Sequence, residues 1–259
     1  MATLNASAAV AAPTPGAPER AAVRSMFDRI APRYDLLNRL LSAGTDVRWR
    51  RAAADALGLR APARVLDLCT GTADLLIEVL GRDARHRGLG VDLSHAMLSR
   101  GGSKLRRRGL DGRAGLASGD AERLPLGDAC CDAATVAFGI RNVSDPGRAL
   151  RELRRVLRPG APLVVLEFAL PRGPLGALYR FYFGRLLPRV GALFSGDAGA
   201  YRYLPESVAR FPSPEAFGAL LAEAGFERVT RAPLSLGIAW IHRGEAPYAP
   251  APAAEAARP

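Results

Sequence analysis

The clearest candidates for ligand binding are two acidic residues that each follow an apolar run. Asp67 lies in segment 64–74 (RVLDLCTGTAD), and Asp92 follows 25 residues later in segment 90–98 (GVDLSHAML). The small residues at 70–73 would let the backbone approach a ligand, and a helix beginning after them would offer unpaired N–H groups. A carboxylate at the position of Asp92 can accept hydrogen bonds from both hydroxyls of a ribose. The pair predicts a site for a nucleotide-type cofactor.

The composition of the turn at 70–73 favours S-adenosylmethionine over a dinucleotide. A dinucleotide site usually contains G-x-G-x-x-G, whose glycines admit a pyrophosphate, and here Gly71 is the only glycine in the turn. The turn resembles the D-x-G-x-G-x-G segment of Rossmann-like methyltransferases, with Cys69 and Ala73 in place of the outer glycines. By itself, the turn is equally compatible with an ordinary connection between a strand and a helix.

Six further segments resemble one enzyme family, the ubiquinone/menaquinone biosynthesis C-methyltransferases. Two of them, 138–145 (FGIRNVSD) and 201–207 (YRYLPES), are far more specific than the cofactor turn, which many methyltransferases share. The others are 26–38 (MFDRIAPRYDLLN), 120–125 (DAERLP), 157–160 (LRPG) and 241–244 (IHRG). Together they extend the resemblance over most of the chain, from about residue 23 to residue 244.

The resemblance implies transfer of a methyl group from S-adenosylmethionine to a ring carbon of a polyprenylated quinol. Demethylmenaquinol is the leading substrate, and the ubiquinone pathway stays open because both quinols share the geometry of the methylated ring. The main alternative is a methyltransferase of the same fold that acts on another small phenol. Amino-methylating nucleic-acid enzymes place an Asn/Asp-Pro-Pro-aromatic motif where this chain has 138–142 (FGIRN), so we expect no nucleic-acid partner.

Four residues are expected to bind the ribose and the methionine portion of the cofactor. Asp92 would bind the ribose; its alternative role, capping the next helix, could be filled by Ser94. Asp67 would accept a bond from the methionine ammonium or simply hold the loop. Gly71 and Thr72 would face the methionine portion, although both residue types also suit an ordinary turn.

Two further residues, Asp120 and Ala121, follow the third expected strand, where the family contacts the adenine. Asp120 could accept a hydrogen bond from the exocyclic amine, although the Gly119-Asp120 pair also forms an ordinary turn. Ala137 stands where the family often has a small hydroxyl residue. This departure removes one polar contact with the cofactor.

The segment after the fourth expected strand would face the reactive methyl group. Phe138 and Tyr34 would contribute to a dry, apolar pocket, which favours the charge cancellation between a phenolate and a sulfonium. Arg141 would hold the phenolate oxygen or orient a water. Asn142 and Tyr201 are expected to contact the quinol together with Phe138.

The sequence does not single out a general base. Tyr34, Asp35, Tyr201 and His242 could each take a proton directly. A lone histidine late in a chain is more often structural, which weighs against His242. The catalytic candidates are Arg141, Tyr34 and His242, and we expect no metal ion.

Short apolar runs alternate with helical patterns in a way that would position these residues. We expect strands at 64–69, 88–92, 114–118, 132–137 and 162–168, with helices at 74–80, 94–108 and 146–157. This alternation and the resemblance predict an α/β, Rossmann-like class I methyltransferase fold, in which a mostly parallel twisted sheet has helices on both faces. Further elements would be cap helices at 23–41 and 47–57, interrupted by Pro32 and Gly44, and a final helix at 214–224 with strands near 226–231 and 237–242.

The 259 residues are predicted to contain one methyltransferase domain at 21–245. The Ala- and Pro-rich tails at 1–20 and 246–259 are expected to be disordered. The N-terminus does not resemble a secretory signal, and no run is long and apolar enough to span a bilayer. Three cysteines, two of them adjacent, fit a reducing cytoplasm better than a disulfide framework.

The net charge of +11 could indicate an anionic partner or a preference for arginine, because Lys104 is the only lysine. Segment 174–194 combines leucines and aromatic residues with Arg180, Arg185 and Arg189, which would suit a helix at the inner face of the membrane. A core helix with solvated arginines is the alternative. The sequence leaves open both a peripheral membrane contact and a homodimer.

Overall fold

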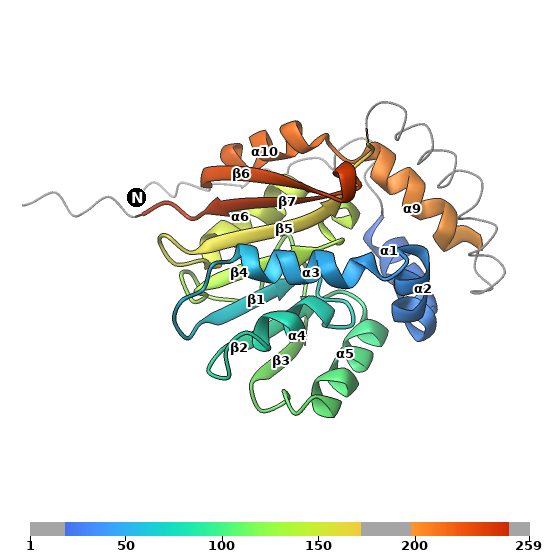
Figure 1. Ribbon diagram of the computed structural model, residues 1–259, viewed down its shortest axis with the longest axis horizontal. Helices are drawn as coiled ribbons and strands as arrows, with labels where there is room; N and C mark the ends of the chain where they lie inside the picture. Colours follow the sequence, from blue (N-terminus) through green and yellow to red (C-terminus); the bar gives the residue numbers. More distant parts are fainter. Residues whose placement is uncertain (1–18, 172–197, 249–259) are drawn as a thin grey trace, which may run out of the picture.

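The computed structural model describes residues 19–171 and 198–248. Its centre is a seven-stranded sheet with the strand order β3-β2-β1-β4-β5-β7-β6 (Figure 1). The strands are β1 (Arg64–Leu68), β2 (Arg87–Asp92), β3 (Ala114–Ser118), β4 (Ala133–Ala137), β5 (Pro162–Phe168), β6 (Glu227–Leu234) and β7 (Ala239–Glu245). The five strands predicted before residue 170 are confirmed to within one residue at each end.

The strand directions create a ligand site at one edge of the sheet. Strands β1 to β5 are parallel, whereas β7 runs antiparallel to both β5 and β6. The strand order reverses between β1 and β4, and at such a reversal a crevice opens outside the carboxyl ends of the strands. The predicted Rossmann-like fold with a mostly parallel sheet is confirmed. The cofactor turn and the segment 138–142 both lie at this carboxyl edge.

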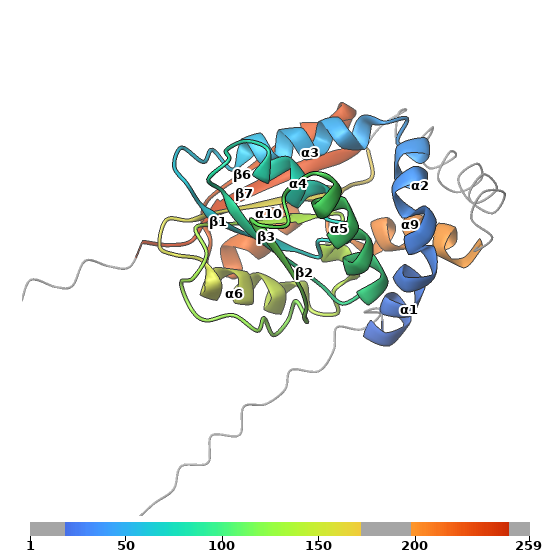
Figure 2. The same cartoon turned by 90° about the horizontal axis from the view of Figure 1, so that it is seen from below.

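Helices cover both faces of the sheet (Figure 2). One face carries α3 (Thr45–Ala56), α4 (Asp74–Leu80) and α5 (His95–Arg107), and the other carries α6 (Pro146–Val156) and α10 (Pro214–Glu223). In β1, Val65 packs in a cluster with Trp49 of α3, whereas Leu66 and Leu68 pack in the cluster that contains Leu150 of α6. Successive side chains of a strand point to opposite faces, so this apolar strand requires cover on both sides.

The helices α1 (Arg20–Ile30), α2 (Tyr34–Leu41) and α9 (Ala198–Arg210) lie together at one end of the molecule (Figures 1 and 2). The predicted cap helix at 23–41 is divided by a 3-10 turn at Ala31–Arg33, because Pro32 cannot donate a backbone hydrogen bond within a continuous helix. The cap helix predicted at 23–41 is therefore confirmed, with its break at the predicted proline. The helix predicted at 47–57 is α3, and its assignment to the cap is wrong, because its buried side chains pack against a face of the sheet. Segment 174–194 lies outside the described residues.

The described residues include both ends of the domain predicted at 21–245. Helix α1 begins at Arg20, and backbone pairing continues one residue beyond β7, because the Ala246 N–H donates to the Ala161 carbonyl at 2.9 Å. Residues 1–18 and 249–259, most of the two predicted tails, lie outside the described residues. Within residues 19–171 and 198–248, no helix is long and apolar enough to cross a membrane, and no group of side chains could hold a metal ion.

Candidate active site

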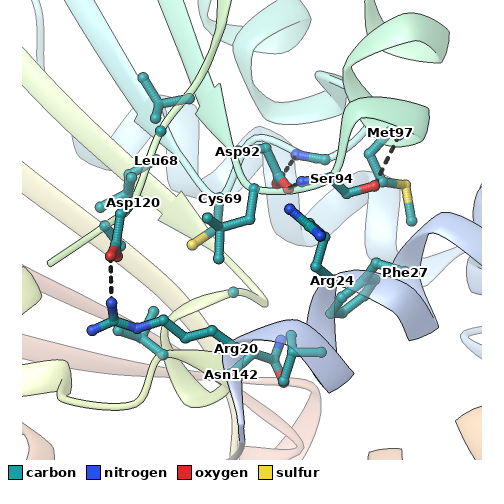
Figure 3. A pocket seen from close by; sticks show the side chains of 18 of the residues that line it. Arg20, Arg24, Phe27, Leu68, Cys69, Asp92, Ser94, Met97, Asp120 and Asn142 are labelled. Carbon is teal, nitrogen blue, oxygen red and sulfur yellow. Dashed lines mark hydrogen bonds and ion pairs between the residues drawn. The ribbon is translucent and has the colours of Figure 1, made fainter. Parts of the chain in front are cut away.

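A cavity lies at the carboxyl ends of the central strands, beneath α1 (Figure 3). It encloses about 720 Å³ of empty space, part of which is open to solvent. Helix α1 contributes a face with helical spacing, made of Arg20, Val23, Arg24 and Phe27. The predicted site residues that line the cavity are Tyr34, Gly71, Asp92, Asp120, Ala121, Phe138 and Asn142.

A smaller, polar pocket adjoins this cavity on the side of the cofactor turn. Asp67 and Thr72 line it, and the two spaces share Tyr34 and Gly71 in their walls. Arg50 of α3 also lines the polar pocket and forms a buried ion pair with Asp46 of the same helix. Sequence analysis did not identify Arg50, because a basic residue in an Arg-rich helix carries no local signal.

Asp92 ends β2 with its carboxylate held toward the cavity by backbone donors. The Gly71 N–H donates to Oδ2 at 2.8 Å, and the Ser94 N–H donates to Oδ1 at 2.9 Å. Burial raises the pKa of this carboxyl above its usual range. Ser94 caps α5, since its hydroxyl oxygen accepts from the Met97 N–H at 3.1 Å. A carboxylate has further lone pairs, so Asp92 can still accept bonds from a ligand.

The cofactor turn has a strained backbone that explains why glycine is common in related turns. Cys69, Gly71 and Ala73 all have positive φ angles, of 54°, 55° and 66°. For a residue with a Cβ atom this region costs about 1–2 kcal/mol, whereas glycine adopts it freely. The two residues that replace glycines in this chain therefore retain the backbone geometry of a glycine-rich turn.

Gly139, in the loop that follows β4, makes a close approach to this turn. A Cβ atom on Gly139 would lie 2.2 Å from the Cβ atom of Cys69, so no other residue fits without movement of the backbone. Phe138, just before it, also has a positive φ of 56°. The loop after β4 and the cofactor turn are thus packed directly against each other at the switch point.

Asp67 is buried beneath the turn and holds two hydroxyl groups. Thr70 donates to its Oδ2 atom at 2.6 Å, and Thr135 of β4 donates to its Oδ1 atom at 2.7 Å. Burial raises the pKa of Asp67 to about 6. These contacts support the loop-holding role that the sequence left open, while the carboxylate also borders the polar pocket.

The adenine candidates, Asp120 and Ala121, lie under the first turn of α1. Arg20 donates to Asp120 Oδ2 at 2.7 Å and also pairs with Glu122, while the Glu122 N–H donates to Asp120 Oδ1 at 3.0 Å. Ala121 is buried. Arg20 was missed by sequence analysis, because its partners lie about a hundred residues away in the chain.

Phe138 lines the cavity and belongs to an aromatic cluster, here called the aromatic wall. The Phe138 ring stacks on Phe168 of β5 with a centroid distance of 4.4 Å, and the Trp49 ring lies 6.1 Å from Phe138. Asn142 lies beside this cluster, donating to the Phe138 carbonyl at 3.4 Å and accepting from the Tyr203 hydroxyl at 3.0 Å. Phe138, which the sequence predicted for an apolar pocket, thus packs with rings from α3 and β5 that the sequence did not predict.

Arg141 does not line the cavity but forms a buried ion pair beside it. Its guanidinium donates to Glu167 Oε1 at 2.7 Å and to the Ser207 hydroxyl at 3.3 Å, and it also bonds the Phe138 carbonyl. Only 7% of the Arg141 side chain and 1% of the Glu167 side chain are exposed. Burial raises the pKa of Glu167. Glu167 is an acidic residue within the otherwise apolar run 162–168, and this sequence feature could have indicated a buried ion pair.

The remaining catalytic candidates occupy different environments. Tyr34 lines both spaces, and burial raises the pKa of its phenol. His242 lies in β7, is 2% exposed, and contacts the Pro214 carbonyl of α10 through Nε2 at 3.1 Å. Burial lowers the pKa of His242 to about 4. It does not line either pocket. Tyr201 belongs to α9, but the structure does not describe the position of its side chain.

Comparison with known proteins identifies the family. The model of the ubiE/COQ5 methyltransferase family matches residues 16–246 of the chain. The chain belongs to this family. A demethylmenaquinone methyltransferase of Thermus thermophilus is 52% identical to this family member over 223 residues, covering 86% of this chain and 100% of the relative.

Two more relatives have similar coverage. A demethylmenaquinone methyltransferase of Deinococcus radiodurans is 49% identical, covering 86% of this chain and 92% of the relative. A ubiquinone/menaquinone biosynthesis C-methyltransferase of Syntrophotalea carbinolica is 48% identical, covering 85% of this chain and 92% of the relative. The resemblance inferred from the sequence segments is thereby confirmed.

Solved structures of lower identity share the fold. The cyclase SpnF has a TM-score of 0.68 at 20% identity, covering 90% of this chain and 98% of that chain. A Thermotoga maritima protein described as a possible histamine N-methyltransferase has a TM-score of 0.61 at 23% identity, covering 86% of this chain and 99% of that chain. Both comparisons support the Rossmann-like architecture.

This ubiE/COQ5 family member is a methyltransferase with S-adenosylmethionine as its cofactor. The residues present fit that cofactor. Asp92 offers acceptors for ribose hydroxyls at the carboxyl edge, the polar pocket beside Asp67 suits a charged amino-acid portion, and Ala121 with Val91 and Leu93 gives an apolar surface for a base. The cofactor that the sequence favoured is therefore confirmed.

Proposed function

We propose that this methyltransferase methylates a ring carbon of demethylmenaquinol, a polyprenylated quinol, in menaquinone biosynthesis. The observation that carries the proposal is the 52% identity to a relative named demethylmenaquinone methyltransferase, which the chain matches over that relative's full length. The cavity supports it, because Phe138 of the aromatic wall and Gly71 of the cofactor turn line the same space. A flat aromatic ring suits such a wall.

The cofactor would be held by the residues at the ends of β1, β2 and β3. In this proposal Asp92 binds the ribose, while Asp67, Gly71 and Thr72 surround the methionine portion. The Thr72 hydroxyl is already engaged with Asp35 at 2.6 Å, so its backbone is the more available contact. Asp120 and Ala121 would border the adenine, and binding there would compete with or reorganise the Arg20 contact.

The quinol would lie against Phe138 and Asn142, with Tyr34 between it and the cofactor turn. S-adenosylmethionine supplies an electrophilic methyl group on a cationic sulfur. The chain contributes a dry aromatic surface, and a reaction that cancels charge is favoured where water is excluded. Tyr34 is the phenol best placed to move a proton at its hydroxyl oxygen, since it borders both spaces.

Arg141 and His242 receive different support as catalytic residues. Arg141 holds the Phe138 carbonyl and the β5 carboxylate, which supports a positioning role for the quinol wall. The contacts of His242 with α10 support a structural role alone. Contact between Tyr201 and the quinol stays a prediction, because the structure does not describe the position of this side chain.

A methyl-transfer assay would test the substrate. Purified protein would be incubated with methyl-labelled S-adenosylmethionine and chemically reduced demethylmenaquinone, and mass spectrometry should find the quinone heavier by one CH₂ group. The Asp92→Ala variant is the negative control. Label transfer to other small phenols with none to the quinol would favour the alternative substrate class.

The same assay would address the ubiquinone pathway. The relative from Syntrophotalea carbinolica has a name that includes both quinones. Reduced demethylmenaquinone and a reduced benzoquinone precursor of matched tail length would be compared by kcat/KM. Equal kcat/KM values for the two quinols would extend the proposed function to both pathways. A large preference for one quinol would assign the enzyme to that quinol's pathway.

We also propose that the cap contacts an anionic membrane. Helix α2 exposes Leu36 by 66% and Leu40 by 48%, and these residues lie one helical turn apart beside the exposed Arg39. Two leucines next to a cationic side chain suit the interface of an anionic bilayer. Tyr34, at the start of the same helix, lines the cavity, so this contact would bring a lipid-tailed substrate to the site.

Vesicle flotation would test this contact. Leu36→Ser with Leu40→Ser should reduce binding to anionic vesicles. The matched control is Tyr248→Ser, because Tyr248 is also 62% exposed but lies beside Gly160, far from the cap in the fold. Vesicle binding that is unchanged by the leucine substitutions would remove α2 from the proposed contact surface.

A further inference from the structure

The single lysine of the chain occupies an unusual position. The chain has 36 lysine and arginine residues together, and Lys104 is the only lysine among them. Lys104 lies in the last turn of α5 with its side chain only 15% exposed. Lys104 is therefore the one side chain in the sequence that carries an ammonium group.

Lys104 connects three separate elements around the cofactor turn. Its Nζ atom donates to Asp35 Oδ2 of α2 at 2.9 Å and to the Thr72 hydroxyl of the turn at 3.0 Å. It also forms an ion pair with Asp74, the first residue of α4. The Thr72 hydroxyl in turn donates to Asp35 Oδ1 at 2.6 Å, so the contacts form a closed network.

The geometry of this network explains why arginine would not replace the lysine. An ammonium is a compact donor with three hydrogens, and here it meets three acceptors that surround one point. A guanidinium is larger and planar, and its donors form a rigid fork. In a site where only 15% of the side chain is exposed, the fork cannot direct hydrogens to all three acceptors at once.

The neighbouring turn of α5 makes a second contact with the cofactor turn. A Cβ atom on Gly101 would lie 3.3 Å from the Ala73 Cβ atom and from the Thr72 carbonyl carbon, which is tighter than most Cβ contacts. Gly101 and Lys104 are three residues apart and therefore share one face of α5. Helix α5 thus supports the turn by close packing at Gly101 and by hydrogen bonding from Lys104.

The acidic partner of Lys104 extends this support to the cap. Burial raises the pKa of Asp35, but the hydrogen bonds from Thr72 and Lys104 outweigh it, and the net pKa is lowered. Asp35 is therefore a carboxylate at neutral pH. It follows Tyr34, which lines both the cavity and the polar pocket, so a fixed Asp35 also fixes where Tyr34 enters the site.

We infer that Lys104 is a positioning residue for methyl transfer, which locks the cap helix α2 onto the cofactor turn through Asp35 and Thr72. The lock holds the turn in its cofactor-binding form and keeps Tyr34 over the site. The inference rests on the proposed contact of the turn with the cofactor. It is independent of which quinol is methylated.

Cofactor binding by calorimetry, without any quinol, tests the lock directly. Lys104→Met should weaken S-adenosylmethionine binding by about tenfold or more, the size expected when a charged hydrogen-bond donor is lost. Hydrogen exchange in α2 should become faster in the same variant. The matched control is Arg82→Met, because Arg82 also joins two acids, Asp55 at 2.9 Å and Glu78 at 3.0 Å, but lies after the far end of α4.

The control separates positioning from general stability. Arg82→Met should lower the melting temperature while leaving the affinity for the cofactor unchanged. If Lys104→Met also lowers only the melting temperature and keeps wild-type affinity and α2 exchange, the inference is overturned. Since no quinol is present, a wrong substrate assignment would leave these outcomes unchanged.

Two further variants test the details of the lock. Lys104→Arg should bind the cofactor as weakly as Lys104→Met, and wild-type affinity would overturn the requirement for an ammonium. Combining Lys104→Met with Asp35→Asn should weaken binding no more than the stronger single change, because both break one network. Losses that multiply across the two sites would show that Lys104 and Asp35 act separately and would overturn the lock.

Discussion

The two walls of the cavity are constructed in different ways. The cofactor wall, at the ends of β1, β2 and β3, uses backbone groups and short contacts, such as the Gly71 N–H on Asp92. The aromatic wall, at the ends of β4 and β5, depends on side chains from distant segments, including the Phe138–Phe168 stack and the Arg141–Glu167 pair. Both walls meet where Gly139 packs on the cofactor turn.

This difference explains how the two walls respond to a change of sequence. The cofactor wall accommodates Cys69 and Ala73 at positive φ, because both side chains are small and the turn keeps its backbone shape. The aromatic wall has no such tolerance, since removal of one partner leaves a buried charge or a gap. Substitutions in the aromatic wall should therefore cost more stability than substitutions in the cofactor wall.

The largest effect is expected at the buried ion pair. Arg141→Leu leaves Glu167 buried without its charged partner and should destabilise the protein by about 3–5 kcal/mol. Arg141→Leu combined with Glu167→Leu should recover most of this stability but not the turnover. Chemical denaturation and initial rates would measure both. A double variant as unstable as the single one would contradict the account of the aromatic wall.

A smaller effect on stability, with a clear effect on binding, is expected in the cofactor wall. Asp92→Ala should weaken S-adenosylmethionine binding by about 1.5–3 kcal/mol, the usual value of hydrogen bonds to a charged acceptor. Asp132→Ala is the matched control, because Asp132 also accepts a backbone bond, from the Arg64 N–H at 2.8 Å, at the opposite edge of the sheet. Calorimetry that finds wild-type affinity in the Asp92 variant would exclude the ribose assignment.

A pH dependence of cofactor binding should come from Asp67. Burial raises its pKa to about 6, so the carboxyl is protonated below this pH and charged above it. Binding of the cationic methionine portion should therefore weaken as the pH falls through about 6. The free protein should show the reverse trend, losing stability as the pH rises from about 4 to about 6, because only the folded state retains the proton.

Asp67→Asn is the variant that checks this assignment. It should remove the step near pH 6 from the affinity profile and bind the cofactor more weakly at neutral pH. Calorimetric titrations across pH 5 to 8 would measure the profile. A step that persists in the variant would assign the titration to another group.

The smallest functional effect is expected for His242, which belongs to neither wall. His242→Leu should keep wild-type turnover and lose about 1 kcal/mol of stability, since one hydrogen bond to the Pro214 carbonyl is lost. Burial lowers the pKa of His242 to about 4, so the wild type should lose stability as the pH falls from about 6.5 to about 4. The variant should show less of this loss, and a large fall in its turnover would restore the catalytic candidate.

Local sequence patterns determined the framework of the fold and most of the cofactor wall. The alternation of apolar runs and helical patterns predicted the strands β1 to β5, and Ser94 caps its helix as the sequence analysis allowed. Asp92 and Asp120 could be found because Asp92 ends β2 and Asp120 lies two residues after β3, and parallel strands end at one edge. These features depend on residues that are close together in the chain.

Tertiary structure alone decided the partners across the chain. The position of β7 between β5 and β6, the pairing of Arg141 with Glu167, and the three acceptors of Lys104 involve segments far apart in sequence. Charged residues have no periodic pattern that reveals such partners, and burial of a charge is favourable only where the folded chain supplies its counterpart. The sequence therefore determined which elements form and which small residues make the cofactor turn, whereas packing decided which charged side chains reach the cavity and which hold its walls.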